Sequence, residues 1–242
     1  MCGIVGVVGN SNAVDILIQG LEKLEYRGYD SAGIYVTDAP DKGCLVKSVG
    51  RIADLRAKIS SDVKGSTGIG HTRWATHGQA TEDNAHPHTS ETGRFVLVHN
   101  GVIENYLQIK EEYLQGHKFK GQTDTEIAVH LIGKFVDEDG LSVLEALKKS
   151  LHIIQGSYAF ALVDSQAPDT IYVAKNKSPL LIGVGEGYNM VCSDAMAMIR
   201  ETSQFMEIHD KELVVLTKDA ITVTDYEGNA IERGTYTAEL DL

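Results

Sequence analysis

The chain has 242 residues, of which 43% are hydrophobic and 23% are charged, as is ordinary for a soluble globular protein. The formal net charge is −12, and a surface this negative repels both phosphate backbones and anionic lipids, which argues against nucleic acid and membrane as partners. The length suits one large domain or two small ones. Because we find no linker, repeat or low-complexity tract, we expect a single domain over 1–242.

The number and spacing of the cysteines indicate whether the protein belongs to a reducing or an oxidising compartment. The chain has three cysteines, Cys2, Cys44 and Cys192, and an odd number without C-x-x-C spacing argues against a disulfide framework. The N-terminus has no basic region, and its apolar run over 4–8 is too short for a signal peptide. No apolar stretch approaches the roughly 20 residues that span a bilayer. We therefore expect a cytoplasmic protein.

The first half of the chain is predicted to begin with a buried strand at 4–8. An amphipathic helix over 13–25 follows, and Ser11 or Asn12 can cap it. Further strands are expected at 33–37, 44–49, 67–72 and 95–99, and a helix at about 102–114.

Two helices in the middle of the chain begin with capping-box signatures, in which a hydroxyl residue precedes a glutamate by three positions. These are Thr123 with Glu126, and Ser142 with Glu145, and the helices are expected to end near 136 and 154. The remaining strands are expected at 158–163, 170–174, 180–183, 189–192, 205–208, 213–216 and 221–224. Strands outnumber helices, and the helices occur in blocks. This predicts an α+β fold of antiparallel sheets with helices packed outside.

Cys2 becomes the first residue once Met1 is removed, and methionine excision requires a small second residue such as cysteine. One residue then carries both a thiol and a free α-amine. Because an α-amine titrates near about 7.7–8.0, a useful fraction is unprotonated at neutral pH and can accept the thiol proton. From position alone, an inert buried cysteine is the more common explanation.

Arg73 and Asp124 could together recognise an α-amino acid. Arg73 ends a predicted strand beside Trp74, where the indole can hold the guanidinium flat and facing a carboxylate. Asp124 lies at a predicted helix start, where its carboxylate can bind an ammonium group. Both also have ordinary explanations, because arginine often packs on tryptophan at surfaces and a carboxylate at a helix start interacts favourably with the helix dipole.

Asn100 and Gly101 lie at a predicted strand-to-helix junction. An asparagine amide and the adjacent glycine N–H can both donate to one developing oxyanion. Asn-Gly is also a common tight-turn dipeptide, so the pair alone is a weak signal. The polar loop over 77–93 is long for a connection, which is typical of functional loops.

Together these segments resemble the class II glutamine amidotransferases, whose N-terminal cysteine is the nucleophile. The resemblance begins with Cys-Gly-Ile-Val-Gly at 2–6 and continues to about 225. The glucosamine-6-phosphate synthase branch is similar in Leu-Glu-Tyr-Arg-Gly-Tyr-Asp-Ser-Ala-Gly at 24–33, His-Thr-Arg-Trp-Ala-Thr-His-Gly at 71–78, Asn-Ala-His-Pro-His at 84–88 and His-Asn-Gly at 99–101. The resemblance implies the N-terminal-nucleophile hydrolase fold, a four-layer α/β/β/α sandwich of two mainly antiparallel sheets.

By the same resemblance, Cys2 is the thiol nucleophile and its own α-amine the general base, while Asn100 and Gly101 form the oxyanion hole. The thiolate attacks the side-chain amide carbon of glutamine, ammonia leaves, and the thioester is hydrolysed to glutamate. Because the mechanism already has its base, we expect only structural or supporting roles for His71, His86 and His99. No metal and no cofactor are expected.

L-Glutamine is the substrate that the resemblance implies. Arg73 is expected to bind its α-carboxylate, and Asp124 its α-ammonium with help from the Gly101 backbone. Thr76 and His77 are expected to lie in a loop that closes over glutamine, with Trp74 at the base of the loop.

Longer members of this branch pass the ammonia to C-terminal sugar-phosphate isomerase domains, which convert fructose 6-phosphate to glucosamine 6-phosphate for amino-sugar synthesis. The chain stops at Leu242, so we expect a glutaminase domain of a longer protein, with those isomerase domains as its partners. A natural stand-alone protein remains open.

Three other functions fit part of the pattern. The purine-pathway amidotransferase that acts on phosphoribosyl pyrophosphate shares the cysteine start and the Asn-Gly pair, but its matching segment lacks the Tyr-Arg-Gly-Tyr-Asp-Ser run at 26–31. A zinc-binding module could use His86 and His88, which an extended strand would place on one side. A non-catalytic glutamine sensor would need Arg73 and Asp124 but not Cys2.

Overall fold

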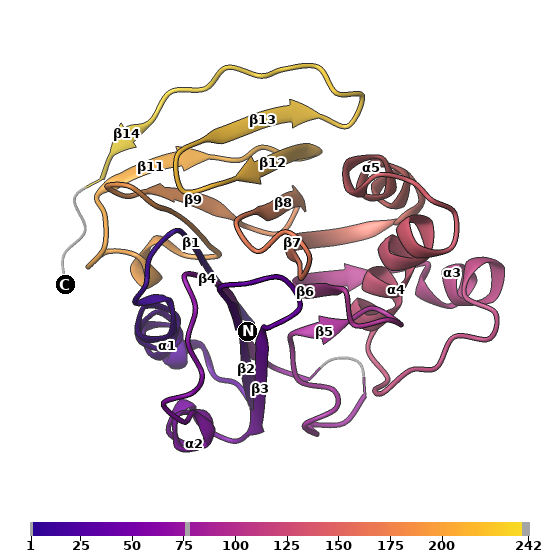
Figure 1. Ribbon diagram of the computed structural model, residues 1–242, viewed down its shortest axis with the longest axis horizontal. Coiled ribbons are helices and arrows are strands. Elements are labelled where there is room, and N and C mark those ends of the chain that lie inside the picture. The colour runs from indigo at the N-terminus through magenta and orange to yellow at the C-terminus, as the bar shows by residue number, and fades with distance from the viewer. Residues whose placement is uncertain (1, 76–77, 239–242) are drawn as a thin grey trace.

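Two β-sheets lie face to face in the computed structural model, which describes residues 2–75 and 78–238 (Figure 1). The first sheet has eight strands: β1 (Gly3–Val8), β2 (Ser31–Thr37), β3 (Cys44–Val49), β4 (Thr67–Arg73), β9 (Leu181–Val184), β10 (Asn189–Cys192), β11 (Gln204–Glu207) and β14 (Tyr236–Thr237). The second has six: β5 (His88–Thr89), β6 (Phe95–Ile103), β7 (Gly156–Asp164), β8 (Ile171–Asn176), β12 (Glu212–Leu216) and β13 (Ile221–Asp225). These strands pair antiparallel throughout.

Helices cover the outer side of each sheet (Figure 1). They are α1 (Ala13–Lys23), α2 (Ile52–Lys58), α3 (Tyr106–Tyr113), α4 (Asp124–Asp137) and α5 (Val143–Ile153), with two 3-10 turns, η1 (Glu25–Arg27) and η2 (Ala195–Ala197). The first two lie on the first sheet, and the other three on the second. Within the described residues, no helix combines the length and the apolar character needed to cross a membrane.

Three apolar layers join the sheets and helices into four layers. Side chains alternate between the two faces of a strand, so Val5 and Val7 on β1 pack toward α1, while Ile4 and Val8 pack between the sheets. A third apolar layer, which includes Phe135 of α4, fills the space between the second sheet and its helices. This arrangement confirms the predicted α+β class and the α/β/β/α sandwich.

Most predicted elements are confirmed, and the strands β3 and β10 have the predicted bounds. The helix predicted over 13–25 ends earlier, at Lys23, and the chain then tightens into η1. Asn12 occupies its N-cap position, but its side chain makes no capping hydrogen bond. Apart from the two 3-10 turns, one helix and two strands of the described chain escaped prediction: α2, β5 and β14. They are too short to show a clear hydrophobic period, because α2 has seven residues and the two strands two each.

The two predicted helix caps are present in part. The Thr123 hydroxyl accepts a hydrogen bond from the Glu126 backbone at 3.3 Å, and the Ser142 hydroxyl accepts one from the Glu145 backbone at 3.2 Å. The Glu126 carboxylate extends beyond the cap and accepts hydrogen bonds from the backbone N–H groups of Lys120 and Gly121. It therefore ties the segment before α4 to the helix.

The predicted strand-to-helix junction at 100–101 is wrong. Strand β6 continues through this pair to Ile103, because its ladder with β7 extends as far as the pairing of Ile103 with Gly156. Helix α3 begins only at Tyr106. Pairing with a partner some 55 residues away in sequence decided the local conformation.

Candidate functional site

Cys2 lies at the end of the first sheet, beside the last residues of β4. The antiparallel register pairs Gly3 with Thr72, which brings Cys2 next to Arg73 and Trp74. The Trp74 backbone N–H donates a hydrogen bond to the Cys2 sulfur at 3.2 Å, and the thiol lies 3.7 Å from the Trp74 carbonyl oxygen. Burial raises the pKa of the Cys2 thiol, while the Trp74 N–H and the Arg73 charge act in the opposite direction.

Asn100 reaches the same place from the second sheet. Its amide nitrogen donates to the Cys2 carbonyl oxygen at 3.2 Å. Its amide oxygen lies 2.9 Å from Nε2 of His71, and this nitrogen is also 3.0 Å from the His99 carbonyl oxygen. Because both neighbours are acceptors, Nε2 of His71 carries the proton. His71 therefore fixes the Asn100 amide with its N–H₂ group turned toward Cys2.

Gly101 has a backbone conformation that other residues rarely adopt. Its φ is +122°, and a Cβ atom there would lie 2.2 Å from the Ser157 carbonyl oxygen. The residue stays in the ladder opposite Tyr158, so its position beside Asn100 is fixed by β7.

Arg73 and Asp124 are both buried, with 3% and 5% of their surface exposed. The Arg73 guanidinium donates to the Gln79 carbonyl oxygen at 2.9 Å, and the Asp124 carboxylate accepts from the Ile103 backbone at 2.8 Å. Burial lowers the pKa of Arg73, whereas the charges of Asp30, Cys2 and Asp124 oppose that shift. Asp124 also lies at the N-terminus of α4, as predicted.

One small cavity of about 30 Å³ is lined by Cys2, Arg73, Gly101 and Asp124 among others. A cavity of that size holds about one water molecule, so residues around it must separate to admit an amino acid. Trp74 lies at the rim and is 52% exposed. The predicted loop residues Thr76 and His77 lie outside the described residues.

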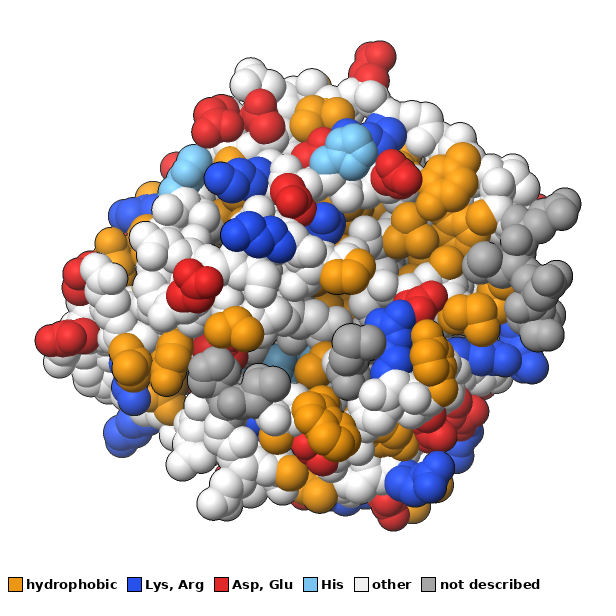
Figure 2. All heavy atoms as spheres, turned by 180° about the vertical axis from the view of Figure 1, so that it is seen from behind, with side chains coloured by type: hydrophobic (Ala, Val, Ile, Leu, Met, Phe, Trp, Pro, Cys, Tyr) orange, Lys and Arg blue, Asp and Glu red, His pale blue; other side chains and the backbone are white. Residues whose placement is uncertain are grey.

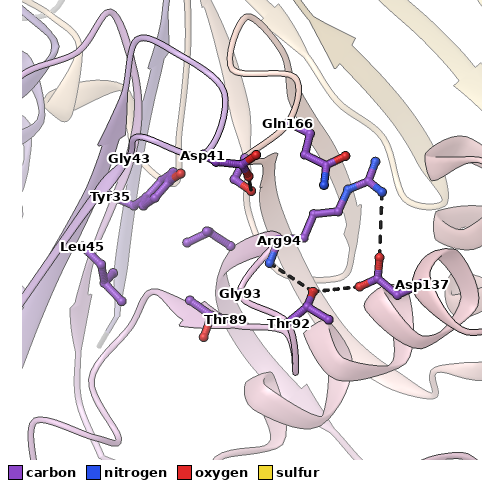
Figure 3. Close-up of a pocket in the computed structure, with 12 residues that line it drawn as sticks. Tyr35, Asp41, Gly43, Leu45, Thr89, Thr92, Gly93, Arg94, Asp137 and Gln166 are labelled. Atoms are coloured by element: carbon purple, nitrogen blue, oxygen red, sulfur yellow. Dashed lines mark hydrogen bonds and ion pairs between the residues drawn. The ribbon is translucent and has the colours of Figure 1, made fainter.

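A larger cavity of about 550 Å³ lies elsewhere, around Arg94 (Figure 3). Arg94 and Asp137 form an ion pair at 3.8 Å in its lining, and none of the described site residues predicted from sequence lines it. Cys2, Arg73 and Asp124 therefore line the smaller cavity and not this larger one.

The sequence of the chain matches a known protein family and individual proteins of that family. A profile of the glutamine amidotransferase domain family matches residues 51–231. The chain belongs to the glutamine amidotransferase family. It is 83% identical over its 242 residues to the glutamine–fructose-6-phosphate aminotransferase [isomerizing] of Streptococcus pyogenes serotype M1, and 79% identical to the protein of that name from Streptococcus pneumoniae strain ATCC BAA-255 / R6. It spans 40% of the length of each.

Solved structures of amidotransferases are similar to this one. Glutamine phosphoribosylpyrophosphate amidotransferase from B. subtilis matches with a TM-score of 0.80 and 28% identity, covering 95% of this chain and 50% of that one. A class-II glutamine aminotransferase domain protein from Silicibacter pomeroyi matches with a TM-score of 0.57 and 14% identity, which supports the fold alone. The predicted N-terminal-nucleophile fold is thereby confirmed. The purine-pathway alternative is a structural neighbour, at far lower sequence identity than the streptococcal proteins.

The amidotransferase site contains two supporting residues that sequence reasoning did not assign. The Asp30 carboxylate accepts a hydrogen bond from the Ala75 backbone N–H at 2.7 Å, and the backbone N–H of Asp30 donates to the Arg73 carbonyl oxygen. The Asn84 side chain donates to the Gln79 carbonyl oxygen and accepts from the Gln122 backbone. Both lie in segments that the family resemblance singled out, at 24–33 and 84–88, and this was the one signal available.

Four histidines near the site, His71, His86, His88 and His99, are buried, and the supporting roles predicted for His71, His86 and His99 stay predictions. The rings of His71 and His86 stack with centroids 3.9 Å apart. Nε2 of His88 lies 2.9 Å from the Thr123 hydroxyl, and Nδ1 of His99 lies 2.8 Å from the Thr125 hydroxyl. Both histidines therefore hold the start of α4. In the described parts of the chain, His86 and His88 belong to no group of three metal-ligating side chains.

Stability of the amidotransferase should fall as the pH decreases from 7 to 5. Burial lowers the pKa of His71 to about 3 and the pKa values of His86 and His88 well below their ordinary value. Below pH 6.5 the unfolded chain binds protons on these rings while the folded chain does not, so acid favours unfolding. Each ring contributes up to about 1.4 kcal/mol per pH unit. Urea unfolding at pH 7, 6 and 5 measures the effect.

The exposed His152 provides the control, because His152→Asn should leave this pH dependence unchanged. A free energy of unfolding that stays constant or rises from pH 7 to pH 5 would contradict the neutral, buried state of the three rings. Most carboxyl groups titrate below about pH 4.5, so this window isolates the histidines.

Proposed function

We propose that this domain hydrolyses L-glutamine to glutamate and ammonia, with Cys2 as the nucleophile once Met1 has been removed. One observation carries the proposal. A thiol from the residue before β1, an amide donor from β6, a guanidinium from β4 and a carboxylate from α4 converge at one place. A thiol beside an oriented amide suits acyl transfer, and a buried cation and anion together suit an α-amino acid.

The chemistry follows from the positions of these groups. The α-amine of Cys2 accepts the thiol proton, and the thiolate attacks the side-chain amide carbon of glutamine. The amide N–H₂ of Asn100 and the backbone N–H of Gly101 stabilise the oxyanion that forms. Collapse of this intermediate transfers the proton to the leaving nitrogen and releases ammonia. Water then attacks the thioester, and glutamate leaves with the thiol restored.

Hydroxylamine tests this route, because it attacks a thioester faster than water does. In its presence, the proposal expects γ-glutamyl hydroxamate to form at the expense of glutamate, with ammonia release unchanged or faster. A domain that releases ammonia without forming hydroxamate would refute the thioester intermediate. A domain that binds glutamine but releases no ammonia would instead support the sensor alternative.

Arg73→Lys is expected to raise the KM for glutamine by about tenfold or more, with a smaller effect on kcat. Lysine keeps the charge but cannot form two parallel hydrogen bonds to a carboxylate, and about 1.4 kcal/mol corresponds to a tenfold change. Steady-state kinetics at saturating and limiting glutamine measure both constants. Arg56→Lys, on the exposed side of α2, is the matched control and should behave like the parent. An unchanged KM in Arg73→Lys would remove Arg73 from the substrate site.

The activity of the whole protein is part of the same proposal. The streptococcal relatives are named for the amination of fructose 6-phosphate, and this chain covers 40% of their length. We infer that ammonia from this domain reaches sugar-phosphate isomerase domains of the full-length chain and forms glucosamine 6-phosphate there. All three cysteines are free, which supports the expectation of a reducing cytoplasm. The single-domain prediction over 1–242 remains our proposal.

A further inference from the structure

Two histidines and a glutamate meet on the outer side of the second sheet, in a cluster that glutamine hydrolysis does not use. Glu91 follows β5, His117 lies between α3 and α4, and His130 lies within α4. Their nearest ligand atoms all lie within 4.8 Å of one another. Nδ1 of His117 is 2.9 Å from Nδ1 of His130, and the Glu91 carboxylate oxygen is 3.9 Å and 3.6 Å from these two atoms.

The other nitrogen of each ring faces a second carboxylate. Nε2 of His117 lies 2.8 Å from the Glu138 carboxylate, and Nε2 of His130 lies 3.8 Å from the Glu126 carboxylate. A histidine that binds a metal through one nitrogen usually directs the N–H of the other to a carboxylate, which sets the tautomer and the ring orientation. His117 shows that arrangement at hydrogen-bond distance, whereas Nε2 of His130 faces its carboxylate at 3.8 Å without a hydrogen bond. Both rings turn their Nδ1 atoms inward toward Glu91.

We propose that Glu91, His117 and His130 form a divalent-metal site that takes Zn²⁺, with a fourth position for water. Two imidazole nitrogens and one carboxylate oxygen are a known zinc ligand set. Nitrogens about 2.0–2.1 Å from a tetrahedral zinc ion lie about 3.3 Å apart, so the two rings need to separate by a few tenths of an ångström. The ion takes the place of the hydrogen bond between the two Nδ1 atoms.

The surroundings suit a cation and hold the ligands in place. Three carboxylates face the two rings, from Glu91, Glu126 and Glu138, and they give this region a negative potential. Both histidine side chains are well buried, with 7% and 2% exposed, whereas the Glu91 side chain is 39% exposed. The backbone N–H of Lys118 donates to the Glu91 oxygen at 3.0 Å and orients it.

A cavity of about 210 Å³ beside Glu91 and His117 gives an ion a route from solvent. Thr92 and Asp137 line both this cavity and the larger one in Figure 3. The three ligands come from three separate segments. Bound zinc would therefore fasten the 114–122 segment and the turn after β5 to α4, the helix that carries Asp124.

Zinc titration of the intact chain, without a histidine tag, tests the site. A free N-terminal cysteine also chelates zinc through its sulfur and amine, so the titration uses the Cys2→Ala background. We expect one equivalent of Zn²⁺ to bind at pH 7.5, and the midpoint of thermal unfolding to rise with zinc concentration. Cobalt(II) in place of zinc should give the visible absorption of a low-coordinate site, without a thiolate charge-transfer band.

His117→Asn and Glu91→Gln should each weaken zinc binding at least tenfold and remove the thermal shift, because each deletes one ligand. Glu91→Gln changes a partly exposed side chain without changing its length, so this variant is expected to fold like the parent. His152→Asn is the matched control and should bind zinc like the parent. Absence of stoichiometric binding would overturn the proposal and leave a plain hydrogen bond between the two rings. Binding that survives both ligand variants would also overturn it, because the ion would then lie elsewhere.

Discussion

Cys2→Ala is expected to reduce glutamate release by at least about 10⁴-fold, because no other group at the site can form the thioester. Glutamate produced from glutamine in a coupled dehydrogenase assay measures the loss. Cys44→Ala is the matched control and should keep full activity, since Cys44 lies on the outer strand β3 of the first sheet. Cys192 cannot substitute for Cys2, because complete burial strongly raises the pKa of its thiol.

The same variant separates catalysis from binding. Cys2→Ala keeps Arg73 and Asp124, so calorimetry should still detect glutamine binding. Full turnover in Cys2→Ala would refute the nucleophile assignment. Loss of both turnover and binding, with the fold intact by circular dichroism, would show that Cys2 acts in recognition and would also contradict the proposal.

Asn100→Ala is expected to lower kcat by about 10²–10³-fold, with little change in KM. Removal of a single oxyanion-hole donor typically has this effect, because the lost hydrogen bond forms mainly in the transition state. Steady-state kinetics with glutamine provide the measurement. Asn229→Ala, in an exposed turn beyond β13, is the control and should match the parent. A raised KM with unchanged kcat would place Asn100 in ground-state binding instead.

Local sequence patterns predicted most of the fold because short apolar runs mark the buried strands and capping residues mark the starts of helices. Strand β10 and helix α4 illustrate this, since an apolar run and a threonine cap gave their starts correctly. The error at 100–101 has a different origin. An Asn-Gly pair ordinarily favours a turn, but here a long ladder with β7 keeps the pair within strand β6. Such a contact between distant segments leaves no trace in local periodicity.

The candidate site, too, could be predicted from the sequence only in part. The family resemblance, rather than any local pattern, indicated that Cys2, Arg73, Asn100 and Asp124 belong together. In the structure Cys2, Arg73 and Asp124 line one cavity, and Asn100 donates a hydrogen bond to the Cys2 carbonyl oxygen. The family resemblance could not indicate how the Asn100 amide is oriented. His71 does this from the opposite sheet, across 29 positions of sequence. The proposed zinc ligands were equally hidden, because no metal-binding motif spaces Glu91, His117 and His130.

The outer surface adds little to this account of function. Acidic, basic and hydrophobic side chains are interspersed over the face shown in Figure 2. On this face the charges are therefore mixed and do not form one patch of a single sign. We expect recognition of glutamine to depend on the buried Arg73 and Asp124.

Glutaminase activity before and after the N-terminus is freed tests the central claim most directly. The chain is prepared with a short cleavable extension before Cys2, and intact mass spectrometry verifies each form. With the extension attached, the Cys2 nitrogen is an amide without a basic lone pair, so we predict negligible glutamate release. Cleavage that leaves Cys2 first should restore full activity. Equal activity in the extended and cleaved forms would contradict the α-amine as base and, with it, the proposed mechanism.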